Sequence, residues 1–288
     1  MRTLAAMRLG SFETPGGERL VGELVNDRIQ RLEVASMIAW LAGEGRDRAG
    51  EQFEPGELRP LAPVPEPPSV RDFYAYEGHV AAAARLRGGE IAAHWYEAPA
   101  FYFSNPASIL GPGEPLRRPQ ATALLDFELE IAAIIGVAAG EPEIAGFTLM
   151  NDWSARDLQA GERTVGLGPA KAKDFGTSLG PWLVTPDELP YEDGRLRIGA
   201  RVFVNGEQVA SADASEKHFG WQEIVAHAAR DTRLRAGDVL GSGTLAGGCL
   251  LELGPLPAPD RGEGRWLEPG DLVVLEADGL GRLETPVE

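Results

Sequence analysis

Apolar residues in this chain occur in short runs separated by glycine and proline, a pattern that favours short strands over long helices. The run from Leu124 to Gly136 is rich in isoleucine and ends at a glycine, so we predict a strand over 124–135. Side chains alternate between the two faces of a strand. Glu128 and Glu130 are therefore expected to share one face of a largely apolar element.

Two carboxylates on such a strand have two interpretations. On a solvated edge strand they are ordinary surface acids, which is the better interpretation of the pair taken alone. If they are buried, like charges need a cation between them, because burying them unpaired is costly. Hard divalent ions such as Mg2+, Mn2+ and Ca2+ prefer carboxylate oxygens, so a metal site is the second interpretation.

The remaining pattern predicts a β-rich α+β protein. Helical spacing covers 34–41, alanine-rich sequence covers 79–87, and further helices are expected over 224–229 and from about Asp152. Asn205-Gly206 predicts a two-residue hairpin. Other short strands are predicted over 99–103, 108–110, 238–240, 250–253 and 272–276.

A proline-rich segment divides the chain. Five prolines lie between Arg59 and Pro68, and proline cannot donate to a strand ladder. We predict a small N-terminal α/β domain over 1–58, an extended connector over 59–69 and a large β-rich domain over 70–288.

Composition narrows the possible partners and location. The 288 residues carry a formal charge of −17 and show no basic patch, so nucleic acid is not expected as a partner. No apolar run reaches the length of a signal peptide core or a membrane span. Cys249 is the only cysteine, which fits a reducing compartment, and we expect a cytoplasmic protein without a membrane partner.

Several other polar residues are candidates for chemistry, and each has an ordinary alternative. Asp152 is a possible third metal ligand or a helix N-cap, and Asp72 is a possible fourth ligand or a turn acid. Lys173 lies among small residues that suit a substrate loop, but a solvated lysine is the default. Glu252 lies in an apolar segment, where a histidine partner would relieve its burial and act as a general base. The turn over 241–244 offers N–H groups and a hydroxyl to an anion, and its ordinary alternative is a plain turn.

Taken together, these motifs resemble the fumarylacetoacetate hydrolase family, and the resemblance covers nearly all of 70–287. The matching segments are Asp72-Phe73-Tyr74 with His79, the run from Asp126 to Glu130, the run from Asn151 to Gln159, Lys173 to Thr177, and Gly241 to Thr244 with Glu252.

The resemblance implies a mixed β-roll, usually assembled as a homodimer, and a metal-dependent enzyme. It implies that one Mg2+, Mn2+ or Ca2+ ion is held by Asp72, Glu128, Glu130 and Asp152. It further implies that His79, paired with Glu252, activates water. Arg156, Gln159 and Lys173 would stabilise the developing charges, and Tyr74 and Thr244 would bind substrate. The nearby Glu77 is an alternative partner for His79.

The resemblance also implies hydrolysis of a C–C bond in a diketo or 2-oxo acid, the expected small-molecule substrate. Members that cleave fumarylacetoacetate carry a tyrosine shortly after the Trp-Ser-Ala-Arg-Asp motif, whereas 160–167 contains none. An acylpyruvate is therefore an equal candidate. Decarboxylation, isomerisation or dehydration of a 2-oxo acid stays open, as does a metal- or ligand-binding protein without turnover.

Overall fold

The structure is a computed structural model that describes residues 6–45, 47–258 and 264–288. Residues 1–5 lie outside the described residues, so the structure does not test the expectation about a signal peptide core there. None of the helices in the described part has the length and apolar character needed to cross a bilayer.

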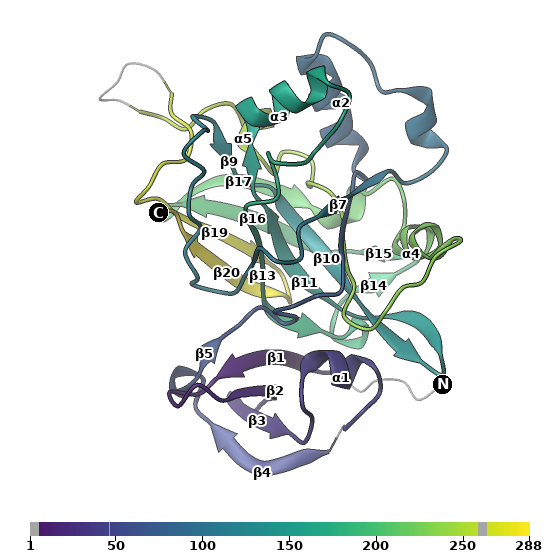
Figure 1. The fold of residues 1–288 in the computed structure, drawn as a ribbon, viewed down its shortest axis with the longest axis vertical. Coiled ribbons are helices and arrows are strands. Elements are labelled where there is room, and N and C mark those ends of the chain that lie inside the picture. The colour runs from purple at the N-terminus through teal and green to yellow at the C-terminus, as the bar shows by residue number, and fades with distance from the viewer. Residues whose placement is uncertain (1–5, 46, 259–263) are drawn as a thin grey trace.

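One large mixed sheet organises the described residues (Figure 1). It has twelve strands there, in the order β4-β3-β2-β1-β13-β11-β10-β18-β6-β7, with β5 beside β1 and β8 beside β13. The β18–β6 and β13–β8 pairs are parallel and the other pairs are antiparallel. The strands are β1 Arg8–Glu13, β2 Arg19–Val25, β3 Arg28–Leu32, β4 Arg48–Phe53, β5 Arg59–Pro60, β6 Val70–Phe73, β7 Phe101–Ser104, β8 Ile109–Leu110, β10 Leu129–Ala138, β11 Glu141–Asp152, β13 Thr177–Val184 and β18 Val239–Gly241.

Smaller sheets and short helices surround it. A four-stranded sheet has the order β17-β16-β19-β20, and two further pairs are β12–β9 and β14–β15. These strands are β9 Leu125–Asp126, β12 Ser154–Ala155, β14 Tyr191–Glu192, β15 Arg195–Leu196, β16 Gly199–Val204, β17 Glu207–Asp213, β19 Leu272–Ala277 and β20 Gly281–Pro286. The helices are α1 Met37–Leu41, α2 Glu77–Leu86, α3 Arg156–Thr164, α4 Trp221–Ala229 and α5 Leu250–Leu253, with 3-10 turns at Pro55–Glu57, Ala93–Tyr96, Pro186–Glu188 and Ala214–Glu216.

Strand β10 is buried on both faces. Ile131, Ala133 and Ile135 belong to the core shared with the four-stranded sheet. Ala132 and Ile134 belong to a second core on the opposite face, shared with α1. Two-sided burial explains why this strand reads as a nearly continuous apolar run.

The N-terminal residues extend the large sheet. Leu9 of β1 lies opposite Leu183 of β13, so β1 to β4 form one edge of the sheet that also contains β10. Figure 1 shows this unit at the opposite end of the molecule from α2, α3 and α5. The domain boundaries themselves stay a prediction.

Most of the sequence predictions of elements are confirmed. The hairpin at Asn205-Gly206 joins β16 to β17, and helices form over Glu77–Leu86, Trp221–Ala229 and, shorter than predicted, Met37–Leu41. The strand predicted over 124–135 is interrupted: β9 ends at Asp126 and β10 begins at Leu129, which leaves Glu128 outside a strand.

Two predictions of local structure are wrong. The segment 250–253 is helix α5, because the distant Asp126 carboxylate accepts the N–H groups of Leu250 and Leu251, and Gly254 ends the helix with φ of 87°. Asp152 is the last residue of β11, and the predicted helix begins only at Arg156, so the N-cap alternative for Asp152 fails.

Candidate active site

Strand register brings three acidic side chains to one face of the large sheet. Asp72 of β6 lies opposite Gly241 of β18, which in turn lies opposite Ala132 of β10. Glu130 shares the face of Ala132, because the two residues are two apart on one strand. Met150 of β11 pairs with Glu130, and Asp152 lies two residues after Met150 at the end of the same strand. Asp152 is therefore on the same face as Glu130. No local sequence spacing reveals this arrangement.

Glu128 joins these residues from the segment just before β10. Asn151 holds this segment by accepting the backbone N–H of Glu128 at 2.9 Å. Asp72, Glu128, Glu130 and Asp152 are all buried, and a carboxylate oxygen from each lies within 4.8 Å of the others. The solvated-edge interpretation of Glu128 and Glu130 is therefore wrong.

Two cations border this carboxylate cluster. Lys173 donates to Glu128 and to Asp152. Arg156 contacts Glu128 at 2.8 Å and Asp126, a fifth buried acid, at 2.7 Å. Burial alone would raise the pKa of Glu128, but Lys173 and Arg156 hold it below its ordinary value. Lys173 is thus a buried ion-pair partner rather than a solvated side chain.

The donor set fits a hard divalent ion. Five carboxylates face two cations, which leaves an excess of negative charge where water cannot screen it. Burial and Asp152 raise the pKa of Asp72, and burial and Asp72 raise the pKa of Glu130. The buried Oδ1 atom of Asp152 has no hydrogen-bond partner in the described part of the chain. An ion at this point would supply the missing positive charge and a partner for that oxygen.

A histidine–glutamate pair lies next to the cluster. His79 Nδ1 stands 2.6 Å from Glu252 Oε1, and the side chains are 6% and 9% exposed. The backbone N–H of Gly247 donates to the second oxygen of Glu252 at 3.1 Å. Burial alone would raise the pKa of Glu252, but the hydrogen bond and charge interaction with His79, together with the Gly247 N–H, lower it below its ordinary value. Glu77 instead accepts the hydroxyl of Tyr96 at 2.8 Å, so it is not the partner of His79.

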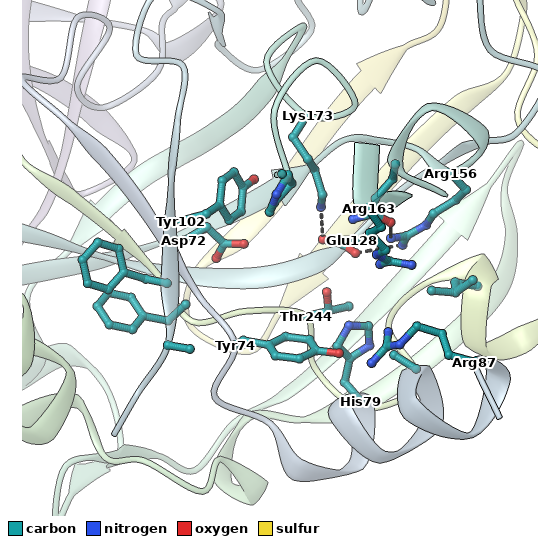
Figure 2. Close-up of a pocket in the computed structure, with 18 residues that line it drawn as sticks. Asp72, Tyr74, His79, Arg87, Tyr102, Glu128, Arg156, Arg163, Lys173 and Thr244 are labelled. Carbon is teal, nitrogen blue, oxygen red and sulfur yellow. Dashed lines mark hydrogen bonds and ion pairs between the residues drawn. The ribbon is translucent and has the colours of Figure 1, made fainter. Parts of the chain in front are cut away.

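A cavity of about 360 Å³ opens beside these groups (Figure 2). Eight of the predicted site residues line its walls: Asp72, Tyr74, His79, Glu128, Arg156, Gln159, Lys173 and Thr244. Glu130, Asp152 and Glu252 are not among the lining residues. Gln159 Oε1 accepts from Arg156 at 3.3 Å, and Thr244 Oγ1 lies 3.5 Å from Glu130. Burial raises the pKa of the Tyr74 phenol, which keeps it a hydrogen-bond donor.

Three further residues reach the cavity without having been predicted. Tyr102 of β7 donates to Asp152 at 2.6 Å. Arg163, near the end of α3, lines the wall near Arg156, and Arg87, directly after α2, lines it near Tyr74 and His79 (Figure 2). The pKa of Arg163 is lowered by burial and by the neighbouring Arg87. The only signal in the sequence was two basic residues close to predicted helix ends, which is too common to single them out.

The fold and site define a β-rich protein with a buried carboxylate cluster and a histidine–glutamate pair at one cavity. Residues 69–288 match the family model described as fumarylacetoacetate (FAA) hydrolase C-terminal. The chain belongs to the fumarylacetoacetate hydrolase family, and the predicted fold class, a β-rich mixed β-roll, is confirmed.

Relatives and solved structures agree with this placement. Fumarylacetoacetases from Bos taurus and Homo sapiens are each 32% identical, over 71% of this chain and 64% of their own length, so the chain spans less than two thirds of these relatives. A structure titled 5-carboxymethyl-2-hydroxymuconate delta-isomerase from Mycobacterium smegmatis is 25% identical, with a TM-score of 0.72 over 98% of this chain and 99% of its own. A 2-keto-3-deoxy-D-arabinonate dehydratase, 23% identical with a TM-score of 0.73 over 98% and 99%, shares the fold.

Proposed function

We propose that this protein is a divalent-metal-dependent hydrolase that cleaves a C–C bond in a β-diketo acid, an acylpyruvate or a fumarylacetoacetate-like compound. The observation that carries the proposal is the His79–Glu252 pair, held at 2.6 Å beside a cluster of four carboxylates. A base of this kind is needed for hydrolysis, which requires an activated water. The family and its fumarylacetoacetase relatives support the same reaction.

Asp72, Glu128, Glu130 and Asp152 would hold the ion, with Mg2+ proposed first and Mn2+ or Ca2+ as alternatives. These are hard ions that take oxygen ligands, and the cluster offers only oxygen. When bound, such an ion supplies Lewis-acid polarisation of the substrate carbonyl and fixes its orientation.

The side chains then have separate tasks. Glu252 accepts a hydrogen bond from the Nδ1–H group of His79, which leaves Nε2 unprotonated. Nε2 can then take a proton from water as the water oxygen attacks the carbonyl carbon. The C–C bond breaks with its electron pair on the leaving carbon, which takes up a proton, and the attacked carbonyl becomes a carboxylic acid. Lys173, Arg156 and Gln159 present N–H groups to the oxygen atoms that gain charge during these steps.

The cavity wall supports a substrate with a second anionic group. Arg87 and Arg163 line it, and neither forms an ion pair with an acid among the residues that the structure describes. In a protein with a formal charge of −17, two unpaired guanidinium groups beside a cavity favour carboxylate ligands. Tyr74 and Thr244 would hold the substrate near His79.

Isomerisation or decarboxylation of a 2-oxo acid is the second candidate. The observation that favours it is the likeness to the structure titled as an isomerase, which is 25% identical with a TM-score of 0.72 over 98% of this chain. These reactions use the same carboxylate cluster but need no attacking water.

A substrate panel distinguishes the candidates. Acylpyruvates, fumarylpyruvate and oxaloacetate are incubated with Mg2+ or Mn2+, and loss of the β-diketone absorbance and release of CO2 are followed separately. We expect hydrolysis of a diketo acid that His79→Ala lowers strongly without weakening metal binding, while the exposed control His94→Ala has no effect. Release of CO2 without diketone cleavage would favour the second candidate, and no turnover of any compound would favour a binding protein. The homodimer and the cytoplasmic location stay predictions.

A further inference from the structure

The His79–Glu252 pair, together with Cys249, forms a second set of metal-ligating atoms. Cys249 Sγ stands 3.5 Å from Glu252 Oε1 and 4.0 Å from His79 Nδ1, and the latter two atoms are 2.6 Å apart. Cys249 is fully buried and His79 is 4% exposed. The three residues come from α2, α5 and the residue directly before α5, so the fold assembles them independently of the carboxylate cluster.

The spacing of these atoms is close to that of a tetrahedral zinc site. Zinc lies about 2.3 Å from sulfur and about 2.0–2.1 Å from nitrogen or oxygen, so neighbouring ligands in a tetrahedron are roughly 3.3–3.6 Å apart. The Cys249–Glu252 distance already falls in this range. The Cys249–His79 distance would shorten by about 0.4 Å, and the His79–Glu252 distance would lengthen by about 0.7 Å as their hydrogen bond gives way to two metal bonds.

The chemistry of the donors differs between the two sites. Sulfur, imidazole nitrogen and one carboxylate suit zinc and related transition ions, whereas an all-oxygen set suits Mg2+. Burial raises the pKa of the Cys249 thiol, so it keeps its proton until a metal displaces it. His79 also lines the cavity, so one of the three ligands borders the space through which an ion would approach.

We propose that His79, Cys249 and Glu252 form a second, inhibitory metal site that takes Zn2+ or a similar transition ion. A metal on His79 Nδ1 leaves the proton of the ring on Nε2, and a protonated Nε2 cannot accept a proton from water. Zinc therefore blocks the base without touching the four carboxylates. Binding stands on the geometry alone, while the inhibition rests on the proposed function.

Cobalt spectroscopy tests the binding. Co2+ is titrated into protein saturated with Mg2+, and the near-ultraviolet sulfur-to-cobalt charge-transfer absorption is recorded. Because the chain has one cysteine, a thiolate band that saturates at one equivalent identifies Cys249 as a ligand. We expect this band in the native protein and in Glu130→Gln, which alters only the carboxylate cluster, and we expect Cys249→Ser to lack it. Absence of the band in the native protein overturns the proposal, whether or not a substrate has been found.

Inhibition is measured separately with whichever substrate is turned over. With Mg2+ in excess, Zn2+ is expected to inhibit without competition from added Mg2+. Each rate is expressed as a fraction of the uninhibited rate of the same protein. On this scale Cys249→Ser and, as a second variant, Cys249→Ala should each raise the half-inhibiting Zn2+ concentration by about tenfold or more over the native protein. Inhibition that excess Mg2+ reverses, or that is equal in all three proteins, would place zinc in the carboxylate cluster and overturn the inhibitory role.

Discussion

At the scale of single residues, the site contains groups whose burial is unfavourable until something compensates for it. Glu130 is fully buried, and its partners are the N–H of Gly243 at 3.2 Å and the hydroxyl of Thr244 at 3.5 Å. Neither carries a positive charge, and the nearest acids repel it. Under the proposed function its carboxylate would serve metal binding, since its burial does not favour stability.

Replacing Glu130 separates these two roles. Glu130→Gln keeps the shape but removes one ligand charge, so we expect metal affinity to fall by about tenfold or more and turnover to be lost. The metal-free variant should be at least as stable as the native protein, because repulsion with Asp72 is relieved. Isothermal titration with Mg2+ and Mn2+ and thermal unfolding without metal measure the two effects. Unchanged metal affinity would contradict the assignment of the cluster.

Lys217 is a buried cation outside the site. Its side chain is almost fully buried, its Nζ atom has no hydrogen-bond partner among the described residues, and it lies 3.3 Å from the centre of the Trp221 ring. Burial lowers its pKa well below the ordinary value, so between the lowered pKa and the ordinary lysine pKa the folded state binds fewer protons than the unfolded state. Through Lys217, the free energy of unfolding of the native protein should therefore rise with pH up to the ordinary lysine pKa.

We expect Lys217→Met to stabilise the protein at pH 7 by about 1–3 kcal/mol, because an apolar chain of similar length needs no partner there. The advantage should shrink as the pH is raised toward 9, because the free-energy cost of deprotonating Lys217 on folding falls as the pH approaches the ordinary lysine pKa. Urea unfolding at several pH values measures both trends, with the exposed Lys171→Met as the control. An advantage that grows with pH would contradict a lowered pKa for Lys217.

At the scale of elements, sequence pattern predicts what local interactions determine. The hairpin at Asn205-Gly206 and the helix ending at Ala229 follow from turn chemistry and apolar periodicity, which are local. The helix at 250–253 could not be predicted, because its N-terminal partner Asp126 is over a hundred residues away. The site divides in the same way: motifs identified the four carboxylates, His79 and Glu252, whereas Arg163 and Tyr102 reach the cavity through tertiary packing alone.

The loop after β18 shows how one element supports the site. Gly243 has φ of 81°, and its N–H donates to both Asp72 and Glu130 at 3.2 Å. A Cβ atom there would lie 2.3 Å from the backbone oxygen of Phe73, next to Asp72 in the chain. The close approach of this loop to β6 therefore requires glycine.

We expect Gly243→Ala to lower the free energy of unfolding by more than about 1 kcal/mol and to weaken metal binding, because the loop must move away from β6. Gly247→Ala is a matched control: φ is 76° there, but the nearest atom to a Cβ is 3.9 Å away. Both variants carry the backbone strain and only the first carries the clash, so metal affinity should differ between them. Equal metal affinities, measured by titration, would mean that the loop does not support the ligands.

At the scale of the whole molecule, the N-terminal unit covers the face of the large sheet that continues into the carboxylate cluster. Met37 and Leu41 of α1 share a core with Ala132 and Ile134 of β10, the strand that carries Glu130. Gly136 of β10 allows this approach, since a Cβ there would meet the backbone oxygen of Leu41 at 3.3 Å. Because the core is shared, the N-terminal unit and the site are expected to unfold together.

Leu41→Ala tests this coupling. Leu41 is 2% exposed, and its truncation should cost about 2–5 kcal/mol through lost burial and the cavity left behind. We expect a single transition in urea in which protection of the β10 and β11 amides from hydrogen exchange falls by the same free energy as the global stability. The exposed Leu167→Ala should change neither quantity. If the β10 amides of Leu41→Ala kept their native protection while the N-terminal strands lost theirs, the unit would be an independent domain, and the carboxylate cluster would not depend on it.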